Sequence, residues 1–377
     1  MKNRVGLRVV HLGHKRIPSR EGGVEIVVEE LSTRMVKRGC SVTCYNRSGY
    51  CSGMKQKRPM TMFEYKGVRL KNVPTWNRKG FAAMTSSIFG AIFSAFSKAD
   101  IVHFHAEGPA FMCWLPKLLG KKVIVTIHGL DWKREKWGKL ASMYIFAGEK
   151  MAVKFADEII VLSEGVKSYF METYKRKTNF IPNGVERPER QPAKLIIQQF
   201  GLEKDSYILF LGRIVPEKGI KYLIKAFKKV STDKKLVIAG GASDTDDFLR
   251  EMKNLAQDDE RIIFTGFVEG RLLEELYSNA YVYTLPSDLE GMPLSLLEAM
   301  SYGNCCLVSN IAECVEVVEN KAVTFSKSNY RDLRVKLQKL CDCEYAVQKY
   351  KIEASDFICN KYNWEDVTEK TLELYYL

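Results

Sequence analysis

The chain has 377 residues, enough for two domains, and 46% of them are hydrophobic, which is sufficient for two separate cores. No segment reaches the roughly 18 apolar residues of a membrane-spanning helix, and the ten cysteines form no C-x-x-C pair. A membrane-embedded protein and a paired-cysteine zinc site are therefore excluded, and reduced thiols are expected.

The net charge of +13 is unevenly distributed. Residues 1–190 hold 34 Lys and Arg against 16 Asp and Glu, a net charge of +18, whereas residues 191–377 carry −5. A basic first half suits a nucleic acid, an anionic membrane or an anionic substrate. Nucleic acid is the weakest of these, because the chain has no nucleic-acid motif and no basic surface interleaved with aromatics.

The first half alternates apolar runs of strand length with longer amphipathic runs. Strands are expected at residues 7–12, 41–46, 62–65, 100–105, 122–127 and 158–162. Helices are expected at residues 24–38, 80–96, 139–155 and 163–169. This alternation predicts a Rossmann-like α/β domain, in which the loops after the strands face the ligand. The aromatics of helix 80–96 are expected in the core or an interface, with membrane-surface contact as the alternative.

Several candidate ligand residues stand where strands end. Gly22-Gly23 lets the backbone approach a ligand at a helix N-terminus, although the chain lacks G-x-G-x-x-G. His105 ends one strand, and His128 follows the next, with Asp131 three residues further on. His103 and His105 share a strand face, but no third metal ligand is evident, so no metal site is expected.

The second half repeats the pattern after a polar linker. Strands are expected at residues 207–211, 235–239, 261–264, 280–285, 304–309 and 323–325, and a closing helix lies within 354–376. Arg213 and Lys218 stand five apart in a strand-to-helix loop. Two such cations are either solvated surface charges or a clamp for a diphosphate.

The segment T-L-P-S-D-L-E-G-M-P-L-S-L-L-E-A-M-S-Y-G, residues 284–303, predicts strand, loop and helix. Pro293 suits the first helical turn, where a missing N–H costs nothing. The amides of Met292, Leu294 and Ser295 can then bind a phosphate or sugar hydroxyls. Glu290 and Glu298 can accept hydrogen bonds from hydroxyls; taken alone, two glutamates eight apart are more often surface carboxylates.

The glutamates, Gly291, Pro293 and the E-A-M together resemble the E-x7-E signature of retaining GT-B glycosyltransferases of family 4, also called glycosyltransferase group 1. The segment H-G-L-D-W at residues 128–132 is similar to a subset of these enzymes that builds bacterial surface polysaccharides. The resemblance covers nearly the whole chain. It implies a GT-B fold, with two Rossmann-like domains facing a central cleft.

The resemblance also implies roles for residues. Arg213 and Lys218 match the diphosphate-binding pair, and Gly22-Gly23 lies against the donor diphosphate. The backbone near Val268 reads the base, Glu290 orients the sugar, and Glu298 binds the ribose. The other donor-binding positions implied are Gly291, Met292, Leu294 and Ser295. His128 lies beside the donor sugar, and His105 and Asp131 are weaker candidates for acceptor binding.

The expected domains are residues 1–188 for the acceptor and 189–357 for the donor, with a helix at about 358–377 returning to the first domain. The expected activity is transfer of a hexose or deoxyhexose from a nucleotide sugar to a glycan or polyprenyl-diphosphate-linked acceptor. No cofactor is expected, because Asp244-Thr-Asp246 matches a metal motif only by its letters. The expected location is the cytoplasm, with peripheral contact to an anionic membrane.

Two rival functions remain open at this point. One is another GT-B enzyme, a phosphorylase or an epimerase, for which no additional signature is present. The other is a non-catalytic partner that binds a sugar nucleotide. Donor hydrolysis or transfer by the pure protein would separate these alternatives.

Overall fold

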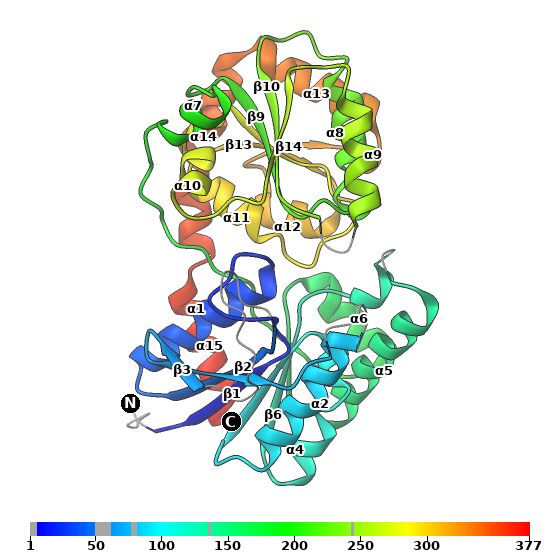
Figure 1. Ribbon diagram of the computed structural model, residues 1–377, viewed down its shortest axis with the longest axis vertical. Coiled ribbons are helices and arrows are strands. Elements are labelled where there is room, and N and C mark those ends of the chain that lie inside the picture. Colours follow the sequence, from blue (N-terminus) through cyan, green and yellow to red (C-terminus); the bar gives the residue numbers. More distant parts are fainter. Residues whose placement is uncertain (1–5, 50–61, 77–80, 135–136, 243–244) are drawn as a thin grey trace. The chain divides into compact units, whose positions relative to one another are not determined.

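The computed structural model describes residues 6–49, 62–76, 81–134, 137–242 and 245–377, and the chain divides into two compact units (Figure 1). Unit 1 comprises Met1–Asn183 and Trp364–Leu377, and unit 2 comprises Gly184–Asn363. The sequence placed the divisions after residues 188 and 357. The second differs because helix α14 (Glu344–Lys361) runs through residue 357 without a break.

Unit 1 is built on an eight-stranded sheet in the order β3-β4-β2-β1-β5-β6-β7-β8. Its strands are β1 (Arg8–Leu12), β2 (Ser41–Arg47), β3 (Met62–Tyr65), β4 (Val68–Val73), β5 (Ile101–His105), β6 (Lys122–Ile127), β7 (Glu158–Val161) and β8 (Asn179–Phe180). Its helices are α1 (Gly23–Lys37), α2 (Phe81–Ala95), α3 (Glu107–Ala110), α4 (Trp114–Leu118), η1 (Asp131–Lys133), α5 (Lys139–Phe155), α6 (Glu164–Tyr174) and α15 (Trp364–Tyr376). Neighbouring strands are parallel except β3, which runs antiparallel to β4.

Strand β4 is absent from the elements expected from the sequence. It forms a hairpin with β3 through Lys66 and Gly67, which both adopt positive φ angles of 49° and 80°. A two-residue hairpin turn of this kind requires positive φ at both positions. The sequence analysis missed this strand, although apolar and charged residues alternate along residues 68–71, a pattern typical of a half-buried strand.

Unit 2 contains a six-stranded sheet in the order β11-β10-β9-β12-β13-β14, and all its strand pairs are parallel. Its strands are β9 (Tyr207–Leu211), β10 (Lys235–Ala239), β11 (Ile262–Gly266), β12 (Val282–Leu285), β13 (Cys305–Ser309) and β14 (Val323–Phe325). Its helices are α7 (Leu195–Phe200), η2 (Pro216–Lys218), α8 (Ile220–Phe227), α9 (Asp246–Ala256), α10 (Gly270–Asn279), α11 (Leu294–Ser301), α12 (Ala312–Val318), α13 (Tyr330–Asp342) and α14. Counted along the unit, the order is 3-2-1-4-5-6, that of a doubly wound nucleotide-binding sheet.

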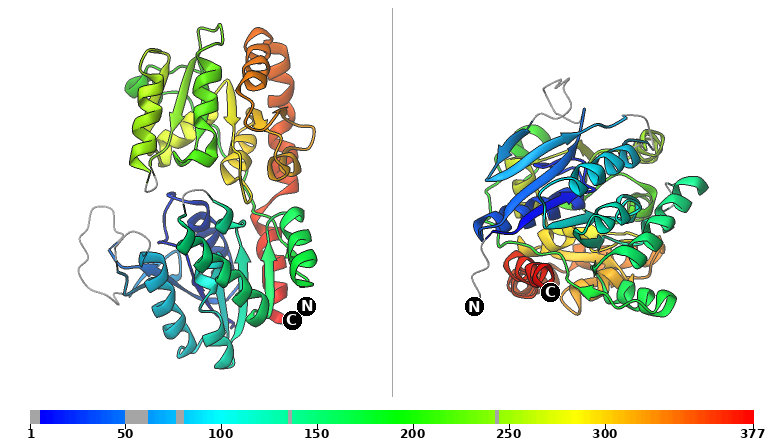
Figure 2. Two further views of the ribbon diagram at one scale, coloured as in Figure 1. Left: turned by 90° about the vertical axis from the view of Figure 1, so that its right-hand side faces the viewer. Right: turned by 90° about the horizontal axis from the view of Figure 1, so that it is seen from below.

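Helices cover both faces of each sheet (Figures 1 and 2), so the central strands are almost wholly buried. In unit 2, α8 packs with α9 and α13, while α11 packs with α14. In unit 1, α2 contacts α3 and α4, and α15 packs against α1. Arg34 and Arg38 of α1 hold Glu365 of α15 at 3.0 and 2.6 Å.

Other sequence expectations can be checked against the described residues. No helix among them combines the length and the apolar character needed to cross a bilayer. The nine cysteines they include are free thiols. Of the aromatics of α2, Phe93 packs on the core, whereas Phe81 and Phe89 are exposed. The basic stretch at residues 50–61 lies outside the described residues.

Candidate functional site

The first candidate site lies in unit 2, where neighbouring strands β9 and β12 end. These strands are adjacent although β10 and β11 separate them in the chain, so the connections after them leave toward opposite faces of the sheet. Ligands of doubly wound sheets bind at such a point, because the two diverging loops leave a crevice there. The loop after β9 carries Arg213 and Lys218, and the loop after β12 carries Glu290.

Lys218 and Glu290 meet at this point as a buried ion pair. Lys218 Nζ donates a hydrogen bond to Glu290 Oε1 at 2.6 Å, and the side chains are only 11% and 7% exposed. Burying two charges costs several kcal/mol per ion, of the order of the attraction between them. A buried pair at a strand-end crevice is therefore poorly explained by stability and well suited to binding a charged ligand.

Glu298 is fixed by a different partner. Tyr277 donates its hydroxyl proton toward Glu298 Oε2 at 3.1 Å, and it also lies 3.3 Å from the carbonyl oxygen of Ser295. Tyr283 lies 2.9 Å from Ser295 Oγ. Two buried tyrosines thus orient the first turn and a half of α11, on which Glu298 stands.

Two glycines allow the loops of this site to approach one another. Gly219 has a φ of 67°, and a Cβ there would lie 1.9 Å from the carbonyl oxygen of Pro286. Gly240 has a φ of 147°, and a Cβ there would lie 1.8 Å from the carbonyl oxygen of Gly212. Both positions need positive φ and the absence of a side chain, so only glycine fits them without rearrangement.

Helix α11 begins one residue later than the sequence indicated. Pro293 is the N-cap, with φ −77° and ψ 98°, and its carbonyl accepts from the amides of Leu296 and Leu297. The amides of Leu294 and Ser295 therefore precede the first intrahelical bonds and can bind an anion. Gly291 and Met292 lie in the loop just before them.

The remaining predicted donor residues of unit 2 also follow strands. Arg213 comes two residues after β9, and Val268 comes two residues after β11. All these loops leave the carboxyl edge of one parallel sheet, so they share one end of the unit. Of the two aspartates in the possible metal motif at residues 244–246, only Asp246 lies within the described residues, where it begins α9.

The second candidate site lies in unit 1, again where non-consecutive strands β1 and β5 are neighbours. Gly22 and Gly23 begin α1 after the long β1 loop. Gly22 has an extended φ of −159°, which any residue can adopt, so its small size matters more than its conformation. Glu25, one turn into the helix, is buried and accepts from the amide of Lys15 at 2.8 Å, which ties the loop to the helix.

His128 and His105 are brought into direct contact at the same end of unit 1. His128 Nε2 lies 3.1 Å from His105 Nδ1. Burial lowers the pKa of His128 to about 4 and holds that of His105 well below its usual range. Both imidazoles are therefore neutral at pH 7, and a neutral imidazole can donate one hydrogen bond and accept another.

Asp131 is held by two partners beside them. Its amide donates to Glu107 Oε2 at 2.8 Å, and its carboxylate accepts from Arg134 Nε at 2.6 Å. Glu107 is buried, and burial raises its pKa to about 10, aided by the negative charges of Asp131 and Glu149. Glu107 is therefore protonated at pH 7.

The sequence analysis missed three of these contributors. His11 is the third imidazole near His103 and His105, so the statement that no third metal ligand is evident was wrong. His11 lies in an expected strand, but only the order of the strands in the sheet places it opposite His103 on β5. Glu149 and Tyr277 carried no comparable signal, because each lies inside an amphipathic helix.

Comparisons with known proteins identify the family and the fold class. A family model for glycosyl transferases group 1 matches residues 193–364, and one for glycosyltransferase family 4 matches residues 21–187. The chain is 24% identical to the alpha-maltose-1-phosphate synthase of Mycobacterium tuberculosis, over 98% of this chain and 99% of that protein.

It is 28% identical to a UDP-Gal:alpha-D-GlcNAc-diphosphoundecaprenol alpha-1,3-galactosyltransferase of Escherichia coli, over 68% of this chain and 70% of that protein. The sucrose-phosphate synthase of Thermosynechococcus elongatus superposes with a TM-score of 0.81 at 20% identity, covering 99% of this chain and 98% of that one. The chain belongs to the GT-B glycosyltransferases of the group 1 and family 4 type.

Proposed function

We propose that this glycosyltransferase takes a sugar from a nucleoside-diphosphate sugar and transfers it, with retention of configuration, to a glycan or polyprenyl-diphosphate-linked acceptor. The synthesis of a cell-surface polysaccharide is the process that we propose. The buried pair of Lys218 and Glu290 carries the proposal, because it places one cation and one acceptor of sugar hydroxyls at a ligand crevice. The name of the Escherichia coli relative specifies the same classes of donor and acceptor.

Lys218 and Arg213 would hold the diphosphate of the donor. The bond between the sugar C1 and the β-phosphate oxygen breaks, and the negative charge on that oxygen rises as it leaves. The acceptor hydroxyl oxygen bonds to C1 on the same face, and its proton passes to the departing phosphate oxygen. Preorganised cations and the amides of Leu294 and Ser295 stabilise this charge without further rearrangement.

The two glutamates have separate tasks in this proposal. Glu290 accepts hydrogen bonds from sugar hydroxyls, and Glu298, oriented by Tyr277, accepts from the ribose. His128 of unit 1 donates to another hydroxyl of the donor sugar. Gly22 and Gly23 let the N-terminus of α1 approach the diphosphate, and the backbone at Val268 contacts the base.

We further propose that transfer needs no metal ion, because two cationic side chains already accompany the diphosphate. The expected result is that a chelator such as EDTA leaves turnover unchanged. Loss of activity with EDTA, restored by a divalent cation, would contradict this part of the proposal.

The acceptor is proposed to be presented at an anionic membrane. Unit 1 carries most of the positive charge, and Trp76, Phe81, Phe89 and Phe96 on and beside α2 are exposed. Exposed aromatics on a positively charged unit are typical of peripheral membrane contact. Co-sedimentation should be stronger with vesicles containing phosphatidylglycerol than with phosphatidylcholine alone. Equal binding to the two kinds of vesicle would contradict the proposed contact with an anionic membrane.

Transfer assays with matched variants test the central proposal. A panel of nucleotide sugars is first screened by thermal shift to identify the donor. Lys218→Ala is then compared with Lys221→Ala. The second variant removes an exposed lysine of the neighbouring helix, whose side chain pairs with Glu251. We expect Lys218→Ala to lose about 100-fold or more in turnover and Lys221→Ala to stay near the wild-type rate.

Melting curves establish that each variant is folded at the assay temperature, and Lys218→Arg should recover part of the rate because it keeps the charge. Near-normal turnover by folded Lys218→Ala would refute the assignment. Donor binding without transfer or hydrolysis by the wild-type protein would favour a non-catalytic partner. Release of a sugar phosphate when inorganic phosphate is supplied would favour a phosphorylase.

A further inference from the structure

All five histidines of the chain lie in unit 1, at one end of three adjacent strands. His11 belongs to β1, His103 and His105 belong to β5, and His14 and His128 follow β1 and β6. His11, His14, His103 and His105 have almost no solvent exposure. The proposed function uses only His128, so the purpose of the others is open.

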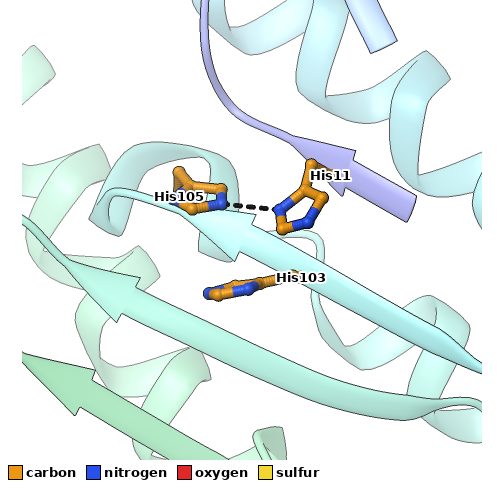
Figure 3. A group of neighbouring side chains, drawn as sticks. All are labelled: His11, His103 and His105. Carbon is orange, nitrogen blue, oxygen red and sulfur yellow. Dashed lines mark hydrogen bonds between the residues drawn. The ribbon is translucent and has the colours of Figure 1, made fainter. Parts of the chain in front are cut away.

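Three of these rings form a continuous hydrogen-bonded chain. His128 Nε2 lies 3.1 Å from His105 Nδ1. On the other side of the same ring, His105 Nε2 lies 2.9 Å from His11 Nδ1, the contact drawn in Figure 3. Burial lowers the pKa of His11 to about 3 and that of His128 to about 4, so each ring is neutral at pH 7. A neutral imidazole has one N–H and one lone pair, so all N–H groups along the chain must point the same way.

The inner end of the chain decides which way they point. His11 Nε2 is buried and has no hydrogen-bond partner within the described part of the chain. If the N–H groups pointed inward, from His128 through His105 to His11, then His11 Nε2 would carry a proton. It would be a buried donor with no acceptor, which native proteins rarely contain. If they point outward, His11 Nε2 is only an unused lone pair. In this outward arrangement His105 donates its Nδ1 proton to Nε2 of His128. Nε2 of His128 is then an acceptor, so the proton of His128 lies on Nδ1.

A metal ion shared by His11, His103 and His105 is the alternative explanation. Ring nitrogens of these residues lie within 4.8 Å of one another. However, the rings of His103 and His105 are stacked, with centroids 4.3 Å apart and planes inclined by 22° (Figure 3). A nitrogen lone pair lies in the plane of its ring, so stacked rings do not converge on one ion.

The contacts of His103 also argue against coordination. Its Nδ1 lies 2.7 Å from the hydroxyl of Tyr375, and its Nε2 lies 2.7 Å from Thr126 Oγ1. Both nitrogens are therefore occupied, and binding a metal would break one of these hydrogen bonds. The observed geometry fits a hydrogen-bonded chain that excludes His103.

We propose that His11 and His105 are positioning residues that hold His128 in the tautomer with its proton on Nδ1. His128 then offers a donor at Nδ1, while Nε2 is occupied by the N–H of His105. The hydrogen bond on one ring nitrogen commonly sets which nitrogen of a histidine is protonated. A role for that donor in contacting the sugar rests on the proposed function, but the tautomer is a property of the ligand-free protein.

Long-range proton–nitrogen NMR of the full chain, labelled with ¹⁵N-histidine, measures the tautomers directly. At pH 7 we expect His128 and His105 to carry their protons on Nδ1. His14 is an internal standard with the opposite tautomer, because its Nε2 must donate to Asn46 Oδ1 at 3.0 Å. The orientation of that amide is fixed, since Asn46 Oδ1 accepts from the amide of Ile17.

A proton on Nε2 of His128, or a mixture of both tautomers, would overturn the proposal in the wild-type protein, whatever the outcome of transfer assays. So would a zinc ion present at one per chain that removes the N–H signals of His11 and His105. Failure of the proposed function would appear instead as absent transfer with the expected tautomers intact.

Two variants then separate positioning from packing. His105→Phe keeps a ring but removes both nitrogens, and we expect His128 to lose its single tautomer and kcat to fall about tenfold. His103→Phe is the matched control, because His103 is equally buried on the same strand but takes no part in the hydrogen bonds that join His11, His105 and His128. We expect the His128 signals of His103→Phe to match the wild type. Loss of the His128 tautomer in both variants would show that packing alone sets it.

Discussion

Lys218 and Glu290 are 72 positions apart in the sequence, yet Lys218 Nζ lies 2.6 Å from Glu290 Oε1 in the interior of unit 2. Their contact follows from strand order, since β9 and β12 are neighbours and each residue stands in the loop after its strand. The pair therefore couples the candidate diphosphate loop to the candidate sugar loop.

The first prediction concerns the coupling between Lys218 and Glu290. Removing either partner leaves a buried charge uncompensated, which costs about 3–5 kcal/mol in the free energy of unfolding. The double variant Lys218→Met with Glu290→Leu should therefore be less destabilised than the sum of the single variants. Urea unfolding of the four proteins gives the coupling energy.

The exposed pair Lys221 and Glu251 is the control for that cycle. Its side chains are 46% and 50% exposed, so its coupling energy should stay below about 1 kcal/mol. Equal coupling energies for the two pairs would show that the burial of Lys218 and Glu290 has no energetic consequence.

The second prediction concerns the tight approach of two loops at Gly219. In Gly219→Ala a Cβ would lie 1.9 Å from the carbonyl oxygen of Pro286, so the loop must move. Gly201→Ala has a similar φ of 59°, but its Cβ would meet only Lys235 Nζ at 3.7 Å. Both variants lose about 1–2 kcal/mol from the backbone conformation, and Gly219→Ala loses more. Thermal unfolding compares them, and equal losses would contradict the clash.

The third prediction concerns the protonation of Glu107. Because its pKa is raised to about 10, Glu107 is a neutral carboxylic acid at pH 7, and Glu107→Gln should match the wild type in stability at about pH 4, where the carboxyl group is protonated in both the folded and the unfolded chain. A group whose pKa is higher in the folded state stabilises at low pH and loses that contribution as pH rises. Glu107→Gln should therefore gain stability relative to the wild type between pH 6 and pH 9.

Glu149→Gln is the contrast in the same cluster. Glu149 accepts from Tyr169 at 2.8 Å, Tyr174 at 2.5 Å and Trp132 at 3.1 Å, so both of its carboxylate oxygens have donors. An amide offers one oxygen in place of two, and we expect a loss of about 1–3 kcal/mol. If Glu107→Gln proved the more damaging variant near neutral pH, Glu107 would be ionised.

The fourth prediction concerns acid stability. Burial lowers the pKa values of all five histidines, to about 3 for His11 and about 4 for His14 and His128. Between pH 6.5 and pH 4.5 the unfolded chain binds protons that the folded chain does not, so stability falls as pH falls. Each histidine contributes about 1.4 kcal/mol per pH unit.

Glu107 opposes this trend above pH 4.5, because its pKa is raised on folding. Its effect on the free energy of unfolding cancels the contribution of about one histidine. The free energy of unfolding, measured in urea at pH 7, 6 and 5, should therefore decline steeply. His14→Gln should reduce the slope by the contribution of one histidine. A protein equally stable at pH 5 and pH 7 would contradict the burial of these rings.

The sequence was sufficient to predict the main architecture, because buried parallel strands have distinctive apolar runs. The six residues of β6 and the 17 of α5 begin and end where their apolar patterns indicated. Pro293 marked the start of α11 to within one residue. The predicted GT-B class is confirmed by the two sheets, which are parallel except for β3, and by the structural relatives.

Tertiary contacts were beyond prediction from local pattern. The five-residue spacing of Arg213 and Lys218 gave no indication that Lys218 pairs with Glu290, since strand order is not written in either loop. Likewise, the histidines at positions 11 and 105 form one chain only because β1 and β5 are neighbours. The buried acid Glu107 lies in a short helix whose apolar pattern is too brief to reveal its partners.

A crystal structure with the donor sugar nucleotide bound tests the central claim most directly. The thermal-shift screen begins with UDP-galactose, and the nucleotide sugar that gives the largest shift is soaked into the crystal. The account predicts diphosphate density beside Lys218 and Arg213, the sugar beside Glu290 and the ribose beside Glu298. Donor density bound away from these four residues would contradict it.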